Sequence, residues 1–345
     1  MMKKIKWLML CVILCAAGLF TGCNRNTQTN DKITIVCTNY ALYDWTSQLV
    51  GDCDAEVILL LNNGTDMHSF QPSAQELIQI ADCNVLVHVG GESDAWLMDA
   101  LAVHPNEERN VVNLTEVLAD DILEEHFTEG MQGEHTHADG SVCAQEHSHE
   151  EHEDVGEDAH SEGSVDEHVW LSLRMAMKSC DAIEEALCNV MPAESELIRS
   201  NAESYRGKLE ALDRQYEDAV TNSNADNVVI VADRFPFLYL MEDYGIQYYA
   251  AFPGCSTESE ADFETVVFMA EKVTEYNTGV LLITESGTDT LAMTVFDNAG
   301  LEGEVAVLHS MQVVYQSDIE AGVSYISYME ANLEVLKRVL DDNGE

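Results

Sequence analysis

The feature that most constrains the fold is an alternation of short apolar runs and helical patterns, which occurs twice. Helical patterns such as SAQELIQIAD, which begins at Ser73, lie between the runs. Strands that alternate with helices indicate a parallel sheet covered on both faces. The sequence therefore predicts an α/β fold with two parallel-sheet lobes. The apolar runs are ITIVC at 33–37, EVILLL at 56–61, NVLVHV at 84–89, NVVIVA at 227–232, GVLLIT at 279–284 and EVAVL at 304–308.

A strong helical pattern separates the two groups of runs. Pro192 suits a first helical turn, and a helix of roughly 28 residues after it would be about 42 Å long. Such a helix can join two lobes rigidly. Its apolar residues recur at steps of three or four: Leu197, Ile198, Ala202, Tyr205, Leu209, Leu212, Tyr216 and Val220. We expect an N-terminal lobe over 31–190, a connecting helix over 191–223 and a C-terminal lobe over 224–345.

The net charge of the chain limits the classes of molecule that it can bind. The 345 residues include 16 basic and 63 acidic ones, which gives a formal net charge of −47. Such a surface repels nucleic acid and anionic lipid, and it attracts cations. The sequence shows no phosphate-cradling Gly-Lys loop and no basic stripe. We therefore expect no nucleic-acid partner.

The N-terminus predicts an export signal over residues 1–22. It has a basic start, an apolar run from Trp7 to Phe20 and small residues before Cys23. The run is shorter than the roughly 20 apolar residues of a membrane-spanning helix. LFTGC resembles a bacterial lipobox, with Phe20 where leucine is more usual, and this implies cleavage before Cys23 and lipidation of its sulfur. Residues 23–30 then form a polar tether that holds the protein outside the cytoplasmic membrane. An ordinary secretory signal is the alternative.

Cysteines are less informative. Seven remain once Cys11, Cys15 and Cys23 are set aside, and an odd number cannot all pair within one chain. No CxxC pair occurs, so we expect no cysteine-rich structural zinc site. The spacing leaves open which disulfides form.

Three histidines stand where strands or helices begin or end. His68 lies in GTDMHSFQPSAQEL, a turn before a helix, and His309 follows the predicted strand EVAVL. His168 lies in VDEHVWLSL, where Asp166, two residues earlier, could orient its imidazole. Open α/β sheets bind ligands beyond the carboxyl ends of their strands. Each histidine alone is more often a surface residue or a hydrogen-bonded core residue than a ligand.

Together these stretches resemble the solute-binding lipoproteins of zinc and manganese ABC transporters, a metal-specific group with two lobes and a rigid connecting helix. The matching motifs lie in order over about residues 31–343. They are NNGTDMHSFQPSAQELIQIADCNVLVHVGGESDAWL, DEHVWLSL, GCSTESEADFETV, LLITESGTDTLA and GVSYISYMEANLEVL. The resemblance implies extracytoplasmic metal capture for a transporter permease, by a monomer that is not an enzyme.

The resemblance also implies four side chains that hold one metal between the lobes. The first two carry over as His68 and His168, and His309 occupies the position of a late aspartate. The usual third ligand position falls on Arg234, whose guanidinium has no lone pair to donate. Asp233 beside it is the substitute we predict, although a helix N-cap is the competing interpretation of this residue. Glu285 is a weaker candidate.

Three imidazoles and one carboxylate suit tetrahedral Zn²⁺. Mn²⁺ prefers more oxygen ligands and lies lower in the Irving–Williams order, so it is the less favoured ion. Two further classes stay open, a metal-buffering adhesin and a zinc hydrolase. The hydrolase is disfavoured because the chain has no HExxH motif.

A tract of histidine and acid interrupts the resemblance from about 126 to 166, and no lysine or arginine occurs in it. It lacks an apolar period to fold around, so we expect a disordered loop that collects metal weakly near the main site. A featureless linker is the alternative. The collecting residues would be His135, His137, His147, His149, His152 and His160.

Overall fold

The fold is that of a computed structural model, which describes residues 32–61, 64–103, 105–125, 127–132, 135–136, 142–143, 165–223, 227–256 and 260–342. From Ile33 onward the chain forms one compact unit that holds two parallel sheets. Among the described residues, no helix is both long and apolar enough to span a membrane.

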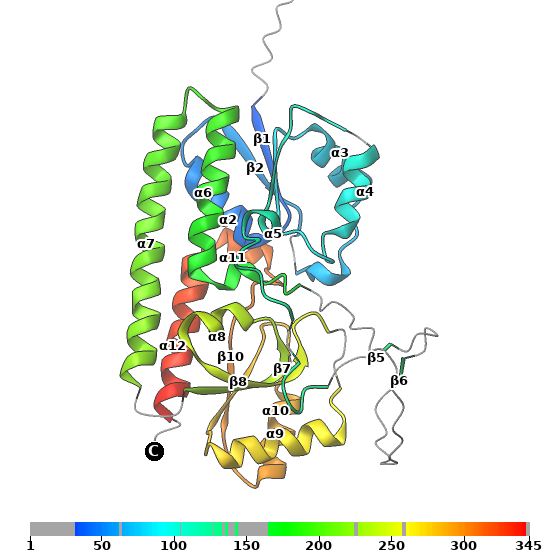
Figure 1. Cartoon of the computed structure of the whole chain (residues 1–345), viewed down its shortest axis with the longest axis vertical. Helices are drawn as coiled ribbons and strands as arrows, with labels where there is room; N and C mark the ends of the chain where they lie inside the picture. The colour runs from blue at the N-terminus through cyan, green and yellow to red at the C-terminus, as the bar shows by residue number, and fades with distance from the viewer. Residues whose placement is uncertain are drawn as a thin grey trace, which may run out of the picture. The chain divides into compact units, whose positions relative to one another are not determined.

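The first sheet has four parallel strands in the order β2-β1-β3-β4. Figure 1 labels two of them, β1 and β2. All four residues of β3 are buried, which is typical of an interior parallel strand covered on both faces. The pattern of apolar runs predicted three of these strands and missed β4. The strands are β1 (Ile33–Cys37), β2 (Ala55–Leu59), β3 (Val85–His88) and β4 (Asn110–Asn113).

The second sheet is also parallel, in the order β10-β9-β7-β8. Its register shifts within β7, between Val231 and Arg234. The sequence pattern missed β8, whose run QYYAAFP begins with a polar residue and ends in proline. The strands are β7 (Val228–Phe235), β8 (Gln247–Pro253), β9 (Val280–Ile283) and β10 (Glu304–Val307).

Helices α2 to α6 accompany the first sheet. The start of α3 follows from its sequence, because Ser73 and Glu76 form a reciprocal capping box. The helices are α2 (Tyr40–Val50), α3 (Ala74–Asp82), α4 (Ala95–Val103), α5 (Leu114–Val117) and α6 (Leu173–Val190), with 3₁₀ turns η1 (Met67–Ser69) and η2 (Val169–Leu171).

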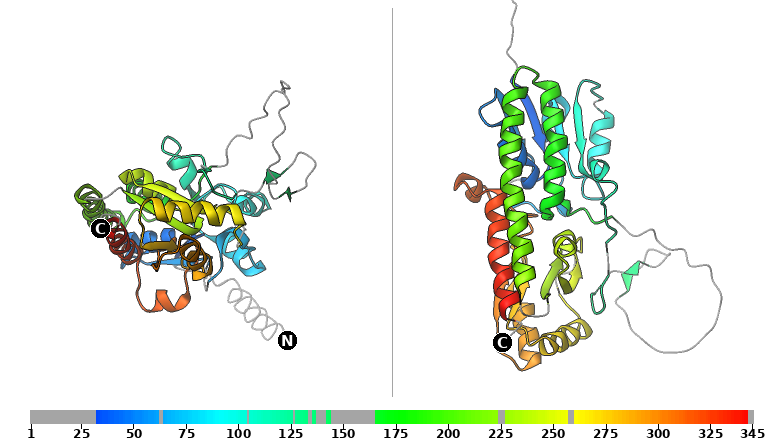
Figure 2. Two further views of the ribbon diagram at one scale, coloured as in Figure 1. Left: turned by 90° about the horizontal axis from the view of Figure 1, so that it is seen from below. Right: turned by 60° about the vertical axis from the view of Figure 1, so that its left-hand side comes forward.

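The long helix α7 (Ser195–Asn222) has 28 residues and packs against helices of both halves. Asn201 donates to the carbonyl of Leu49 in α2 at 3.0 Å, and Tyr216 donates to the carbonyl of Met329 at 2.6 Å. Figure 2 shows α12 (Tyr325–Asp342), drawn in red, alongside the lower part of α7. The helix begins after Pro192, which lies in the preceding turn and not in the first helical turn as the sequence predicted.

The remaining elements belong to the second half and to the tract. Buried residues of both sheets, α7 and α12 form one continuous hydrophobic core, so the two halves pack as a single unit. The elements are α8 (Leu238–Tyr244), α9 (Phe263–Glu275), α10 (Asp289–Ala299), α11 (Gln316–Glu320) and α12 (Tyr325–Asp342), and the antiparallel pair β5 (His135–Thr136) and β6 (Val142–Cys143).

Candidate metal centre

His68 lies in η1, beyond the carboxyl end of β2. The Asp66 carboxylate accepts a hydrogen bond from the backbone N–H of His68 at 2.9 Å, which caps the short turn. On the ring, Nδ1 is 2.9 Å from the hydroxyl of Ser93, a residue of the turn that follows β3. The Nε2 atom is therefore the end of this imidazole that points away from Ser93.

His168 lies immediately before η2 and is fully buried. The Asp166 carboxylate again accepts from the histidine backbone N–H, at 2.8 Å, and it also lies 3.0 Å from Nδ1 of the ring. Tyr239 donates to the Asp166 carbonyl at 2.7 Å and holds this segment against α8. The predicted role of Asp166 in orienting the imidazole is confirmed.

The side-chain amide of Gln312 lies between the two rings. Its Nε2 is 2.9 Å from Nε2 of His68 and 2.7 Å from Nε2 of His168. A carboxylate only accepts, so Asp166 keeps the ring proton of His168 on Nδ1 and leaves a lone pair on Nε2. The amide can donate one hydrogen to each imidazole. Two imidazole lone pairs thus face one small region, which is the arrangement that a metal ion requires.

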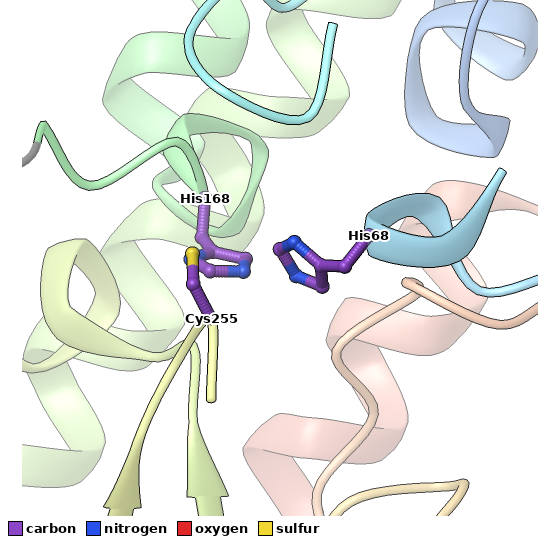
Figure 3. Close-up of side chains that lie close together, drawn as sticks. All are labelled: His68, His168 and Cys255. Carbon is purple, nitrogen blue, oxygen red and sulfur yellow. The ribbon is translucent and has the colours of Figure 1, made fainter. Parts of the chain in front are cut away.

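A third donor joins this pair. His68, His168 and Cys255 offer ligand atoms that all lie within 4.8 Å of one another, and they form the one such group of three in the described residues. Figure 3 shows the Cys255 sulfur beside the His168 ring, with His68 facing them. Cys255 comes shortly after β8, so His68, Cys255 and Gln312 all follow strand ends, where open α/β sheets bind ligands.

The environment acts in opposite directions on the protons of His68 and Cys255. Burial lowers the pKa of His68 from its ordinary 6.5 to about 4, and the neighbouring His168 acts in the same direction, so the ring is neutral at physiological pH. Burial also raises the pKa of the Cys255 thiol, and the carboxylates of Glu125, Glu167 and Asp166 raise it further. A bound metal ion would displace the thiol proton and offset these negative charges.

The structure places Asp233 and Arg234 in other interactions. Asp233 lies in β7, where its carboxylate accepts from the backbone N–H of Thr284 at 2.9 Å and from the Thr284 hydroxyl at 2.7 Å. The competing N-cap interpretation of Asp233 is wrong, because α8 begins after Phe237 and has no side-chain cap. Arg234 forms an ion pair with Asp66 at 3.2 Å and so links β7 to the loop that carries His68.

His309 and Glu285 also lie outside the three-donor group. The backbone of His309 pairs with the Asn332 side chain of α12, at 2.7 Å and 2.8 Å, and its ring packs against Tyr328. Burial lowers the pKa of His309. Glu285 accepts from the N–H and hydroxyl of Ser310, at 2.7 Å and 2.8 Å. That carboxylate therefore shapes the loop that presents Gln312.

Several predicted site residues lie outside the residues that the structure describes. Cys23 does, and so do His137, His147, His149, His152 and His160 with the side chain of His135. The cysteines that the structure describes with their side chains are all unpaired: Cys37, Cys53, Cys83, Cys180, Cys188 and Cys255.

Sequence reasoning missed Cys255 and Gln312. Cys255 lies in GCSTESEADFETV, a motif that supported the family resemblance but was not predicted to contain a ligand. Gln312 lies three residues after His309, which was the predicted ligand of that loop. The sequence marks neither residue, although the structure gives a reason for the glycine that precedes Cys255. A side chain at Gly254 would place its Cβ 2.9 Å from the His168 ring, so glycine permits this close approach.

Residues 35–339 match the family model of the zinc-uptake complex component A, periplasmic (ZnuA). The chain belongs to the ZnuA family. This membership confirms the predicted relationship to metal-specific solute-binding proteins. The family is described as a component of an uptake complex and not as an enzyme, in line with the sequence prediction.

Curated relatives extend the comparison. The zinc-binding lipoprotein AdcA of Streptococcus pneumoniae serotype 4 is 30% identical over 343 residues, which cover 99% of this chain and 62% of that protein. The high-affinity zinc uptake system protein ZnuA of Bacillus subtilis is 26% identical over 338 residues, which cover 96% of this chain and 97% of that one. The chain thus spans about 62% of the length of the pneumococcal relative.

Solved structures agree with the fold. The Zn(II)-bound ZnuA-like domain of Streptococcus pneumoniae AdcA superposes with a TM-score of 0.67 at 26% identity, and covers 90% of this chain and 99% of that domain. The metal-dependent lipoprotein YcdH of Bacillus subtilis superposes with a TM-score of 0.69 at 22% identity, and covers 90% of this chain and 100% of that one. These likenesses confirm the predicted architecture of two parallel-sheet lobes and a long connecting helix.

Proposed function

We propose that this protein captures Zn²⁺ outside the cytoplasmic membrane and delivers it to the permease of an ABC transporter. The observation that carries the proposal is the convergence of His68 Nε2 and His168 Nε2 on one Gln312 amide, at 2.9 Å and 2.7 Å. Family membership supports the role in uptake. The ion is cargo, so the site has to bind it tightly and also release it.

Zinc is the ion that the donors suit better. Neutral imidazole nitrogens bind Zn²⁺ strongly, whereas Mn²⁺ prefers oxygen ligands and higher coordination. The pneumococcal relative is named a zinc-binding lipoprotein, and the structure of its ZnuA-like domain is Zn(II)-bound. Competitive titration of the protein with Zn²⁺ and Mn²⁺ tests this choice. Mn²⁺ binding as tight as Zn²⁺ binding would contradict it.

The ligand set that we propose begins with His68 and His168. His309 and Asp233 stay predicted ligands, and each would have to leave the contacts described above to reach the ion. His309→Ala decides the first case: a loss of zinc affinity as large as that of His168→Ala makes His309 a ligand, and affinity within about threefold of wild type removes it. Asp233→Asn decides the second case in the same way.

We also propose the predicted division of the chain: a signal over 1–22, a tether over 23–30, lobes over 31–190 and 224–345, and a connecting helix over 191–223. Lipidation of Cys23 would hold the protein at the outer face of the membrane, as a monomer. The lipoprotein name of the pneumococcal relative supports this location. Mass spectrometry of the native N-terminus tests it, since lipidation requires an acyl-modified cysteine at position 23.

The tract over 126–166 would supply the transporter with weakly held metal. An imidazole exposed to water has a pKa near 6.5, so we expect acidification to about pH 5.5 to release metal from the tract. Deletion of residues 128–163 should remove the weak zinc equivalents and leave one tight equivalent. Loss of the tight equivalent would place ligands of the main site within the tract.

A further inference from the structure

The three-donor group contains a thiol where the family resemblance led us to expect nitrogen and oxygen ligands. Cys255 reaches the two imidazoles from the second half of the chain, whereas His68 and His168 come from the first half. We propose that the Cys255 sulfur is a direct ligand of the captured zinc, which makes the core of the site two imidazoles and one thiolate.

The loop around Cys255 is packed for this position. Gly254 lies so close to His168 that a Cβ there would meet the ring at 2.9 Å and the Phe235 carbonyl oxygen at 2.9 Å. The backbone N–H of Cys255 donates to the Glu125 carboxylate at 3.3 Å. The loop is thus held from two sides, with the sulfur next to the imidazole.

The three ligand atoms have to move only a short distance toward one another to bind a zinc ion. Tetrahedral zinc with nitrogen ligands at about 2.0–2.1 Å and a sulfur ligand at about 2.3 Å sets its ligand atoms roughly 3.3–3.6 Å apart. The three residues offer ligand atoms that lie within 4.8 Å of one another, so these atoms have to approach by roughly 1.2–1.5 Å at most. The Gln312 amide has to leave the space between the imidazoles, and its departure opens the fourth position.

Binding of Zn²⁺ by the Cys255 sulfur involves no change of oxidation state. Zn²⁺ takes the place of the thiol proton, which goes to solvent, and the sulfur supplies the electron pair of the new bond. A thiolate is a soft ligand that favours Zn²⁺ over Mn²⁺. Cys255 therefore determines specificity. It compensates for Arg234, which stands where the resemblance places a third ligand and cannot coordinate.

This inference rests on the proposed zinc-binding function, and zinc K-edge X-ray absorption of the loaded protein tests it directly. We expect one sulfur neighbour at about 2.3 Å beside nitrogen neighbours at about 2.0–2.1 Å. In Cys255→Ser the sulfur neighbour should disappear. Cys143→Ser is the matched control because Cys143 lies in the His/acid tract, and it should keep the sulfur neighbour.

Affinity provides a second measurement. Cys255→Ser and Cys255→Ala should weaken zinc binding by more than the roughly 10–100-fold that loss of a partner behind a ligand causes. Mn²⁺ binding should change much less, so selectivity should fall. Circular dichroism of both variants checks that they fold.

The outcomes separate the two proposals. A protein that binds no zinc tightly overturns the proposed function. Tight zinc binding without a sulfur neighbour, or with a sulfur neighbour that survives in Cys255→Ser, overturns only the assignment of Cys255. Unchanged zinc affinity in both Cys255 variants overturns it as well.

Discussion

The two histidine loops of the centre use the same local turn and then differ. In each, an aspartate two residues before the histidine accepts from the histidine backbone N–H, at 2.9 Å for Asp66 and His68 and at 2.8 Å for Asp166 and His168. Asp166 also faces Nδ1 of its own histidine at 3.0 Å. Asp66 instead pairs with Arg234, and Ser93 takes its place beside the His68 ring.

This difference shows how one short pattern serves two purposes. Beside His168 the aspartate orients a buried ring and adds negative charge behind it, which makes Nε2 a better metal ligand. Beside His68 the aspartate joins the loop to β7 of the second sheet through Arg234. We infer that His168 is the fixed member of the pair and that His68 follows the fit between the two halves.

The largest expected loss of zinc affinity comes from removal of either imidazole. His168→Ala and His68→Ala should each weaken zinc binding by more than about 100-fold, because loss of a ligand costs more than loss of a partner behind it. Isothermal titration with a competing chelator measures the loss. A variant that binds within tenfold of wild type would remove that histidine from the site.

The next largest loss of zinc affinity should differ between substitutions of the two aspartates. Asp166→Asn should weaken zinc binding by about 10–100-fold, because the amide keeps the shape but loses the charge that supports Nδ1 of His168. Asp66→Asn should cost less than tenfold, since Ser93 and not Asp66 faces the His68 ring. Equal losses in the two variants would show that the Asp166 carboxylate supports its histidine no more than the Asp66 carboxylate does.

A smaller effect, in the opposite direction, comes from the amide that both rings share. Gln312→Glu should tighten zinc binding by about tenfold, because a carboxylate cannot donate to two imidazole lone pairs but can coordinate a cation. Gln75→Glu adds the same charge at an exposed position of α3 and should leave the affinity unchanged. Unchanged or weaker binding in Gln312→Glu would show that the amide does not lie where the metal binds.

The sequence predicted the centre unevenly, for physical reasons. Apolar runs marked the buried strands. β4 (NVVN) was missed because only two of its residues are apolar, and β8 (QYYAAFP) was missed because it begins with a polar residue and ends in proline. His68 and His168 were found because their surroundings are local motifs, and Asp166 acts within two residues of its target. Cys255 and Gln312 reach the site only through the packing of the two halves, which no local pattern records.

The last and smallest effect concerns the metal-free protein and the titration of His68. Burial lowers the pKa of His68 to about 4, whereas an unfolded histidine has its ordinary value of 6.5. Between these pH values the unfolded chain binds more protons at His68 than the folded chain does. The contribution of the neutral His68 to the free energy of unfolding is therefore fully present above pH 6.5, and it declines as the pH falls toward 4. His68→Gln removes this proton uptake and should make the decline shallower. Urea unfolding at pH 7 and pH 5 in a chelator measures it, and an identical decline in both proteins would show that His68 does not titrate in this range.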